Sequence, residues 1–151
     1  HNIFSTLRQQ LNEGKDVAMI TLGDPSLYTT LGYVLENLQE DDYDWEIIPG
    51  VTSISAVAAR LGTSLTKRHL PLHIIPGAYH GLEEYLALPG TKVIMKGGLE
   101  ISDLKEKLKE ADLFENTMMI SDCGLETEVI VKDLNESPDR VSYFTTFVVK
   151  E

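Results

Sequence analysis

Cysteine is nearly absent from the sequence: Cys123 stands alone among 151 residues, so no disulfide can form within the chain. A lone thiol is typical of proteins in a reducing compartment, and we therefore expect a cytoplasmic protein. Long apolar runs are also missing. None approaches the roughly 20 residues that a membrane span needs, so we expect no membrane partner.

Several motifs with well-known chemistry are missing as well. The chain has no GxxxxGK[ST] loop, no GxGxxG turn and no GxSxG elbow, which argues against a P-loop nucleotidase and an α/β-hydrolase. His69, His73 and His80 lack the ligand spacing of a metal site, and we expect no metal. Cys123, beside Gly124, could be a thiol nucleophile, but a lone cysteine at a strand end is more often buried and inert.

Positive charge is scarce, with 13 Lys and Arg against 24 Asp and Glu and a net charge of −11. Nucleic-acid-binding proteins carry basic stripes, so we expect no nucleic-acid partner. Hydrophobic residues make up 42% of the chain and charged residues 25%, which is typical of a globular protein rather than a disordered one.

Two strand–turn–helix units follow one another between Asp16 and Leu65. Val17–Leu22 and Trp45–Ile48 are short apolar runs that predict buried strands, and each is ended by a turn. Apolar residues then recur at helical spacing after each turn: Leu27, Leu31, Val34, Leu35 and Leu38 in the first unit, and Val51, Ile54, Val57, Ala58 and Leu61 in the second. Two such units predict a parallel sheet with both turns at its carboxyl edge, where ligands bind.

The two turns, GDPS at 23–26 and Pro49–Gly50, each have a purely structural interpretation. Asp24 followed by Pro25 is a good helix start, and Pro-Gly is a common turn signal. Together they indicate more, because a glycine lets a ligand approach the backbone and Asp24 offers a carboxylate. Hydroxyls and helix N–H groups follow the second turn at 51–53.

The rest of the chain predicts an α/β protein with two lobes. A helix is expected at residues 3–11, and the polar, basic stretch 63–69 is the candidate linker, so we place the lobes at 1–67 and 68–151. In the second lobe we expect helices at 82–88 and 101–111, and strands at 72–75, 91–95, 117–120, 129–131 and 141–149. The order of these elements predicts a mixed sheet.

The segments LGDPSLYTT, EIIPGVTSISAVAARLGTSL and VIMKGG, in this order, resemble the tetrapyrrole (corrin/porphyrin) methyltransferase family. The resemblance covers nearly the whole chain. It is strongest to the branch that methylates C-20 of precorrin-2 or cobalt-precorrin-2 in cobalamin biosynthesis. It implies the class III S-adenosylmethionine methyltransferase fold, S-adenosylmethionine as cofactor with S-adenosylhomocysteine as product, a tetrapyrrole substrate and a homodimer.

Two other functions remain open at this point. The chain could be another tetrapyrrole methyltransferase or a diphthine synthase, or a non-catalytic α/β domain that binds a ligand or mediates assembly. The family's first strand and its glycine-rich GxGPGD turn do not occur in this sequence. We therefore expect a fragment with an incomplete first lobe, inactive by itself, that self-associates through exposed strands or leaves part of Asn2–Leu65 poorly ordered.

The resemblance implies cofactor contacts, which fall on Leu22, Gly23, Asp24, Leu27, Thr52, Ser53, Met95, Lys96 and Gly124. Met95 and Lys96 compete for one position at a strand end; Met95 has the alternative role of strand core, and Gly124 that of a turn glycine. Lys67 and Arg68 could meet substrate carboxylates, as Lys96 could, or be ordinary solvated charges. No catalytic residue is expected to stand out, because a sulfonium methyl is already activated and transfer depends on alignment.

Overall fold

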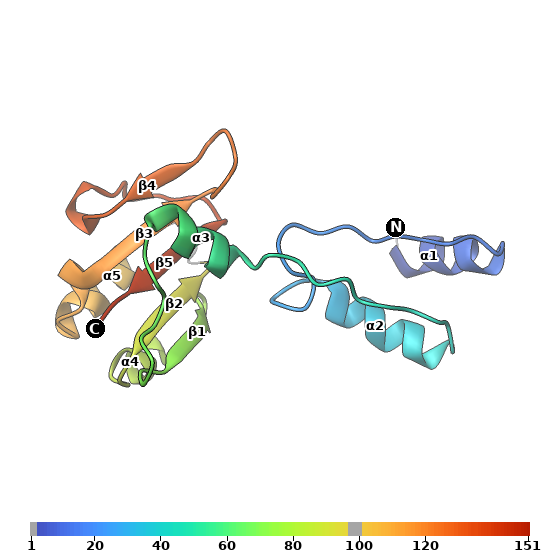
Figure 1. Ribbon diagram of the computed structural model, residues 1–151, viewed down its shortest axis with the longest axis horizontal. Coiled ribbons are helices and arrows are strands. Elements are labelled where there is room, and N and C mark those ends of the chain that lie inside the picture. The colour runs from blue at the N-terminus through green and yellow to red at the C-terminus, as the bar shows by residue number, and fades with distance from the viewer. Residues whose placement is uncertain (1–2, 97–100) are drawn as a thin grey trace. The chain divides into compact units, whose positions relative to one another are not determined.

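The computed structural model describes residues 3–96 and 101–151, and its contacts divide the chain into two compact units, His1–Thr52 and Ser53–Glu151 (Figure 1). We describe each unit by itself. Residues 53–67 group with the second unit, and the lobe boundary expected after residue 67 stays a prediction.

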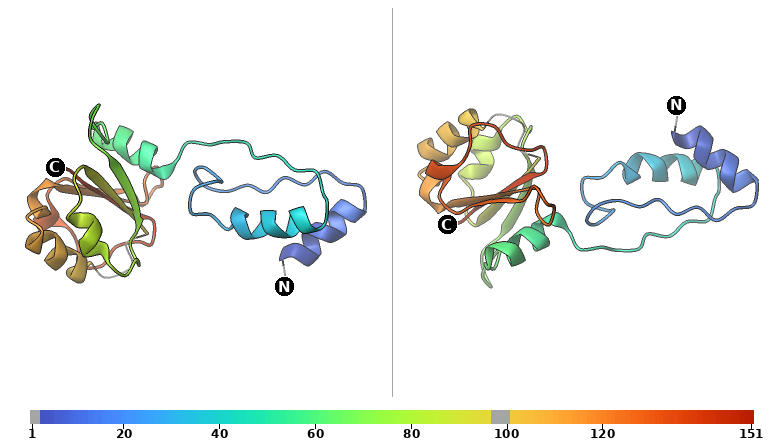
Figure 2. Two further views of the ribbon diagram at one scale, coloured as in Figure 1. Left: turned by 90° about the horizontal axis from the view of Figure 1, so that it is seen from below. Right: turned by 90° about the horizontal axis from the view of Figure 1, so that it is seen from above.

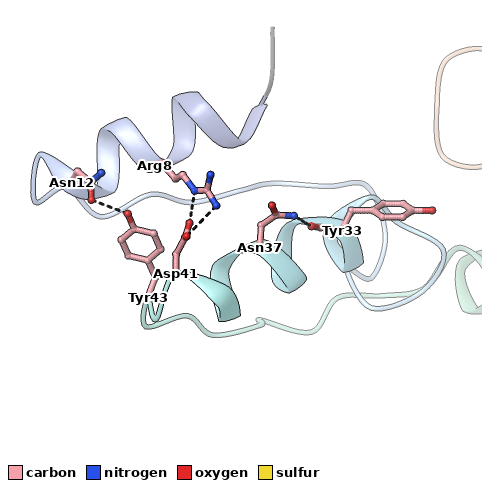
Figure 3. Close-up of polar contacts among 6 residues, drawn as sticks. All are labelled: Arg8, Asn12, Tyr33, Asn37, Asp41 and Tyr43. Carbon is pink, nitrogen blue, oxygen red and sulfur yellow. Dashed lines mark hydrogen bonds and ion pairs between the residues drawn. The ribbon is translucent and has the colours of Figure 1, made fainter.

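The first unit contains helices α1 (Ile3–Asn12) and α2 (Leu31–Glu40). Polar side chains join α1 to the residues that end α2 (Figure 3). The Arg8 guanidinium donates two hydrogen bonds to the Asp41 carboxylate, one of them 3.0 Å long, and the Tyr43 hydroxyl donates to Asn12 Oδ1 at 2.8 Å. The guanidinium–carboxylate fork fixes the direction of approach as well as the distance.

Helix α2 begins at Leu31, four residues later than the apolar spacing from Leu27 predicts. The reason lies in the preceding turn, where Asp24 Oδ1 accepts a hydrogen bond from the Ser26 N–H at 2.8 Å. This local contact competes with the helical one. Tyr28 then takes a φ of +53°, which a right-handed helix cannot include, so the chain starts its helix only beyond it.

The two strands predicted in the first unit are wrong: Val17–Leu22 and Trp45–Ile48 are extended but form no strand among the described residues. Their side chains are not buried, with Ile20 91% and Ile48 68% exposed. An apolar run predicts that a segment seeks burial, whereas a strand also needs a neighbour that accepts and donates its backbone hydrogen bonds. No such neighbour pairs with either segment in the described part of the chain.

The second unit is built on a five-stranded sheet, formed by β1 (Leu72–Pro76), β2 (Thr91–Met95), β5 (Thr145–Val149), β3 (Thr117–Ser121) and β4 (Val129–Val131) in that spatial order. β1 and β2 are parallel and the other neighbours are antiparallel, so the predicted mixed sheet is confirmed. The closing strand is shorter than predicted: it begins at Thr145, because residues 143 and 144 form a turn.

Helices cover both faces of this sheet (Figure 2). α4 (Leu82–Leu86) and α5 (Ser102–Glu110) pack with Ile94, Phe147 and Met119, all fully buried, in one apolar core. α3 (Ser53–Leu61) buries its apolar side against the opposite face and contacts β5. Two 3₁₀ turns complete the unit, at Phe114–Asn116 and Leu134–Glu136. Successive side chains along each strand point to opposite faces of the sheet, so each face needs a layer of helix to cover it.

Candidate functional site

The carboxyl ends of β2 and β3 meet at one edge of the sheet, with the start of β5 between them. The strand register pairs Met95 with Thr146 and Ser121 with Thr145. We call this place the carboxyl edge and define it by Met95, Lys96, residues 121–124 and residues 143–145. The arrangement depends on β5 running antiparallel between two strands that point the same way.

The backbone at the carboxyl edge is unusual at both strand ends. Lys96, directly after β2, has a φ of +55°, and Asp122, directly after β3, has a φ of +51°. L residues other than glycine seldom adopt this left-handed conformation, and it gathers at functional sites. At Asp122 the carboxylate stabilises the turn, accepting from Thr127 Oγ1 at 2.9 Å and from Ser142 Oγ at 2.5 Å.

The turn that leads into β5 presents two aromatic rings. Tyr143 and Phe144 are both exposed and pack edge to face, with ring centroids 5.4 Å apart. The Lys96 ammonium lies 5.5 Å from the centroid of Tyr143. Exposed aromatic faces beside a cation can stack against a planar ring or receive an anionic group.

The turn at Gly124 is held by an acidic side chain. The Gly124 N–H donates to Glu128 Oε2 at 2.8 Å, and the Arg60 guanidinium of α3 donates to Glu128 Oε1 at 2.7 Å. These two donors hold the pKa of the Glu128 carboxyl below its usual range, and the Gly124 N–H has the larger effect. Burial raises the pKa of the neighbouring Cys123 thiol. A raised pKa favours the protonated thiol, which is less nucleophilic than the thiolate.

In the first unit the two turns lie together, as the sequence predicts. Asp24 joins them: its Oδ2 accepts from the Gly50 N–H at 2.9 Å, while its Oδ1 accepts from the Ser26 N–H and hydroxyl. A Cβ on Gly50 would overlap the carbonyl oxygen of Gly23. The turns therefore touch backbone to backbone, which explains a glycine at position 50.

We predict that this contact depends on pH. The Ser26 hydroxyl, followed by the backbone N–H groups of Gly50 and Ser26, lowers the pKa of Asp24. Because the folded pKa is depressed, the contribution of Asp24 is complete above the ordinary aspartate pKa of about 3.9 and is lost as pH falls through the lower folded pKa. NMR titration of the Gly50 amide measures it; Asp24→Asn, which cannot titrate, is the control. An ordinary pKa for Asp24 would contradict the prediction.

Each sequence-predicted position can now be located. Met95 and Lys96 lie at the carboxyl end of β2, and Gly124 lies three residues after the carboxyl end of β3, on the same edge of the sheet. The other positions lie elsewhere in the two units: Leu22, Gly23, Asp24 and Leu27 around the first turn, Thr52 at the end of the first unit, and Ser53 at the start of α3. Their role in binding stays a prediction.

Lys67 and Arg68 lie apart from the carboxyl edge. Both are exposed and lead into the amino end of β1, whereas Met95 and Lys96 lie at the carboxyl end of the parallel strand β2. Lys150 follows β5 at that opposite end, where burial, and after it the charge of Lys67, lowers the pKa of Lys150. The structure thus does not bring these two cations together with Lys96.

Sequence reasoning missed Asp122, Glu128, Tyr143 and Phe144. Residues 141–149 were predicted as one continuous strand, which hid the turn that exposes the two rings. An available signal was Ser142, a short polar residue that competes with a strand: its hydroxyl accepts from the Phe144 N–H at 3.1 Å. No local pattern marks Glu128, because its partner Arg60 is 68 residues away.

In the described residues no group of three or more His, Cys, Asp or Glu side chains is arranged to hold a metal ion. No helix in the same part of the chain is long and apolar enough to cross a membrane.

Comparison with known families gives a match over residues 1–138 to the model of the Tetrapyrrole (Corrin/Porphyrin) Methylases. The probable cobalt-precorrin-2 C(20)-methyltransferase of Methanocaldococcus jannaschii is 39% identical over 104 residues, which are 69% of this chain and 43% of that protein. The cobalt-precorrin-2 C(20)-methyltransferase of Salmonella typhimurium is 32% identical over 155 residues, which cover all of this chain and 65% of that protein. The chain thus spans between two fifths and two thirds of these relatives.

Solved structures agree in fold. Cobalt precorrin-4 methyltransferase superposes with a TM-score of 0.73 at 20% identity, covering 97% of this chain and 68% of that one. The uroporphyrin III C-methyltransferase of Thermus thermophilus also gives 0.73 at 20% identity, covering 99% and 69%. The expected class III methyltransferase fold is confirmed. This chain belongs to the tetrapyrrole (corrin/porphyrin) methylase family.

Proposed function

We propose that the protein containing this chain transfers a methyl group from S-adenosylmethionine to a tetrapyrrole in cobalamin biosynthesis. The observation that supports it is the carboxyl edge, where Met95 and Lys96 end β2 and Gly124 lies in the turn after β3; all three are positions that we expect to bind the cofactor. Membership of the methylase family supports the reaction class.

The groups at the carboxyl edge fit a nucleoside. The side of Gly124 where a Cβ would stand faces open space, so a planar base can approach the backbone there. Tyr143 and Phe144 add exposed aromatic surface, and the edge lies at strand carboxyl ends, where α/β proteins bind such ligands. In the first unit, the Gly50 N–H donates to Asp24 and so fixes the shape of the two turns, whose role in binding stays a prediction.

The cofactor, when bound, supplies a methyl group on a positively charged sulfur that needs no further activation. The protein residues then have to hold the reactants in line and keep water out, and such alignment can supply a large part of the acceleration. The carboxylates of Asp24, Asp122 and Glu128 are all engaged in hydrogen bonds that fix turns. We therefore assign them to positioning and name no catalytic residue.

The finer proposal is that C-20 of precorrin-2 or cobalt-precorrin-2 receives the methyl group. The two C(20)-methyltransferases with 39% and 32% identity support it. A precorrin-4 C(11)-methyltransferase of Pseudomonas aeruginosa is 45% identical over 64 residues, so the second candidate is transfer to C-11. Mass spectrometry and NMR of the methylated product distinguish the two carbons. A homodimer and a cytoplasmic location stay predictions.

We expect S-adenosylhomocysteine to bind. Isothermal titration calorimetry tests this on a protein that contains this chain and any residues that adjoin it. Lys96→Ala should weaken binding several-fold, because it removes a cation from the carboxyl edge. Lys109→Ala is the matched control: its ammonium also lies over an aromatic ring, 4.8 Å from the centroid of Phe114, but away from the edge.

The outcomes separate the candidate functions. Absence of heat at millimolar S-adenosylhomocysteine would contradict the proposed function. Binding without methyl transfer to either precorrin would favour a non-catalytic ligand-binding domain. Equal effects of Lys96→Ala and Lys109→Ala would show that the cofactor does not occupy the carboxyl edge.

A further inference from the structure

Glu128 is placed between two elements that are distant in sequence. One carboxylate oxygen accepts from the Gly124 N–H at 2.8 Å, and the other accepts from Arg60 of α3 at 2.7 Å. The Glu128 side chain is only 11% exposed, although it belongs to a surface loop. Each oxygen of this partly buried carboxylate therefore has a different partner, one on the turn and one on α3.

We propose that Glu128 is a positioning residue for the cofactor site: it fixes the Cys123–Gly124 turn against α3 so that the Gly124 backbone can receive the ligand. The inference rests on the proposed function and extends it, because Glu128 is not among the positions implied by the family resemblance. Glu128 touches neither cofactor nor substrate in this proposal and acts through Gly124.

An ordinary surface ion pair would look different. Lys107 bonds to Asp103 and Glu83, but both carboxylates are largely exposed, Asp103 to 77%, and all three residues lie on helix surfaces. Such pairs contribute little to stability because water solvates the separated charges almost as well. Glu128 also binds a backbone N–H, and a charge-assisted bond to backbone restrains the main chain itself.

A backbone hydrogen bond from the Leu125 N–H to the Asp122 carbonyl, 2.9 Å long, closes this turn, but the glycine within it has no side chain that packs. Gly124 has a φ of +80° and no atom near its missing Cβ, so packing does not hold it in place. Asp122, two residues before Gly124, accepts hydrogen bonds from Thr127 and Ser142, which fixes the start of the turn. Glu128 supplies the restraint at the glycine.

The reactivity of Cys123 reports on the state of this turn. It is the only cysteine in the sequence, so alkylation by iodoacetamide is unambiguous. Burial and the Glu128 carboxylate both raise the pKa of its thiol. Removing Glu128 should therefore speed alkylation, and a ligand bound at Gly124 should slow it in the wild-type protein.

The test compares Glu128→Ala, Glu128→Gln and the control Asp103→Asn. Each variant is made in a protein that contains this chain and any residues that adjoin it. For Glu128→Ala we expect about tenfold weaker binding of S-adenosylhomocysteine, the loss typical of a charge-assisted hydrogen bond, together with faster Cys123 alkylation. Glu128→Gln keeps an acceptor for Gly124 and should recover most of the affinity. Asp103→Asn should change neither readout.

The outcomes distinguish failure of this inference from failure of the proposed function. Wild-type protein that binds no S-adenosylhomocysteine removes the proposed function and this inference with it. Wild-type binding with unchanged affinity in Glu128→Ala, while alkylation is faster, overturns the positioning role and leaves the proposed function standing. If Glu128→Ala does not fold, Glu128→Gln decides alone: its neutral amide leaves a weaker bond to the Gly124 N–H, so an affinity a few-fold below wild type would support the inference and an affinity equal to wild type would overturn it.

Discussion

Gly50→Ala is expected to separate the two turns of the first unit and to weaken binding of S-adenosylhomocysteine at least tenfold. An added Cβ would overlap the carbonyl oxygen of Gly23 and lie 3.2 Å from its carbonyl carbon. Both are backbone atoms, so the turn itself has to shift, and the Gly50 N–H then loses its bond to Asp24. Overpacking of this kind costs about 1–3 kcal/mol of unfolding free energy.

Gly32→Ala is the matched control in the same unit. Gly32 lies in α2, and a Cβ there meets nothing within 4 Å. Alanine is the better helix former, so this variant should be more stable by about 0.5–1 kcal/mol. Calorimetric titration and thermal unfolding of both variants give the comparison. Wild-type affinity in Gly50→Ala would show that the close contact of the turns is not needed for the ligand.

Gly90→Ala is expected to give the largest loss of stability in the second unit. Gly90 has a φ of +99°, and a Cβ there would overlap the Pro71 carbonyl oxygen and come within 2.7 Å of Pro71 Cγ. That oxygen also accepts from the Thr91 N–H at 3.1 Å, so a shift disturbs the first bond between β1 and β2. Backbone strain and overpacking together amount to about 2–5 kcal/mol.

Gly62→Ala isolates the backbone part of that loss. Gly62 also has a positive φ, +68°, but a Cβ there has open space, so only the strain of about 1–2 kcal/mol remains. Denaturant unfolding of the two variants gives both numbers. Equal losses would show that the Pro71 contact relaxes without cost and that the fit between β1 and β2 is looser than the structure indicates.

The sequence predicted the second unit well because its strands and helices form locally consistent segments. The run 91–95 has a hydrogen-bonded strand on each side, and its bounds are those predicted. In the first unit the same reasoning gave two strands that are absent from the described residues. The difference is physical: Val17–Leu22 has the same apolar character as β2 but lacks a paired neighbour, and a ladder of hydrogen bonds needs two strands.

The candidate site was predictable only in parts. Met95, Lys96 and Gly124 followed from a resemblance, and Asp24 and Gly50 from turn chemistry. Tyr143 and Phe144 could not be found, because their exposure depends on where β5 begins. Glu128 could not be found either, because its role depends on a partner in α3.

The sequence by itself determined the α/β class, the approximate positions of the helices and the succession of the strands along the second unit. These depend on periodicity, turn residues and short-range hydrogen bonds, which are encoded within a few positions. Only the tertiary structure decided that β5 lies antiparallel between β2 and β3, and so brings Met95 and Ser121 to one edge. Strand pairing and the Arg60–Glu128 contact join residues far apart in the chain, and no local pattern specifies which distant segment is the partner.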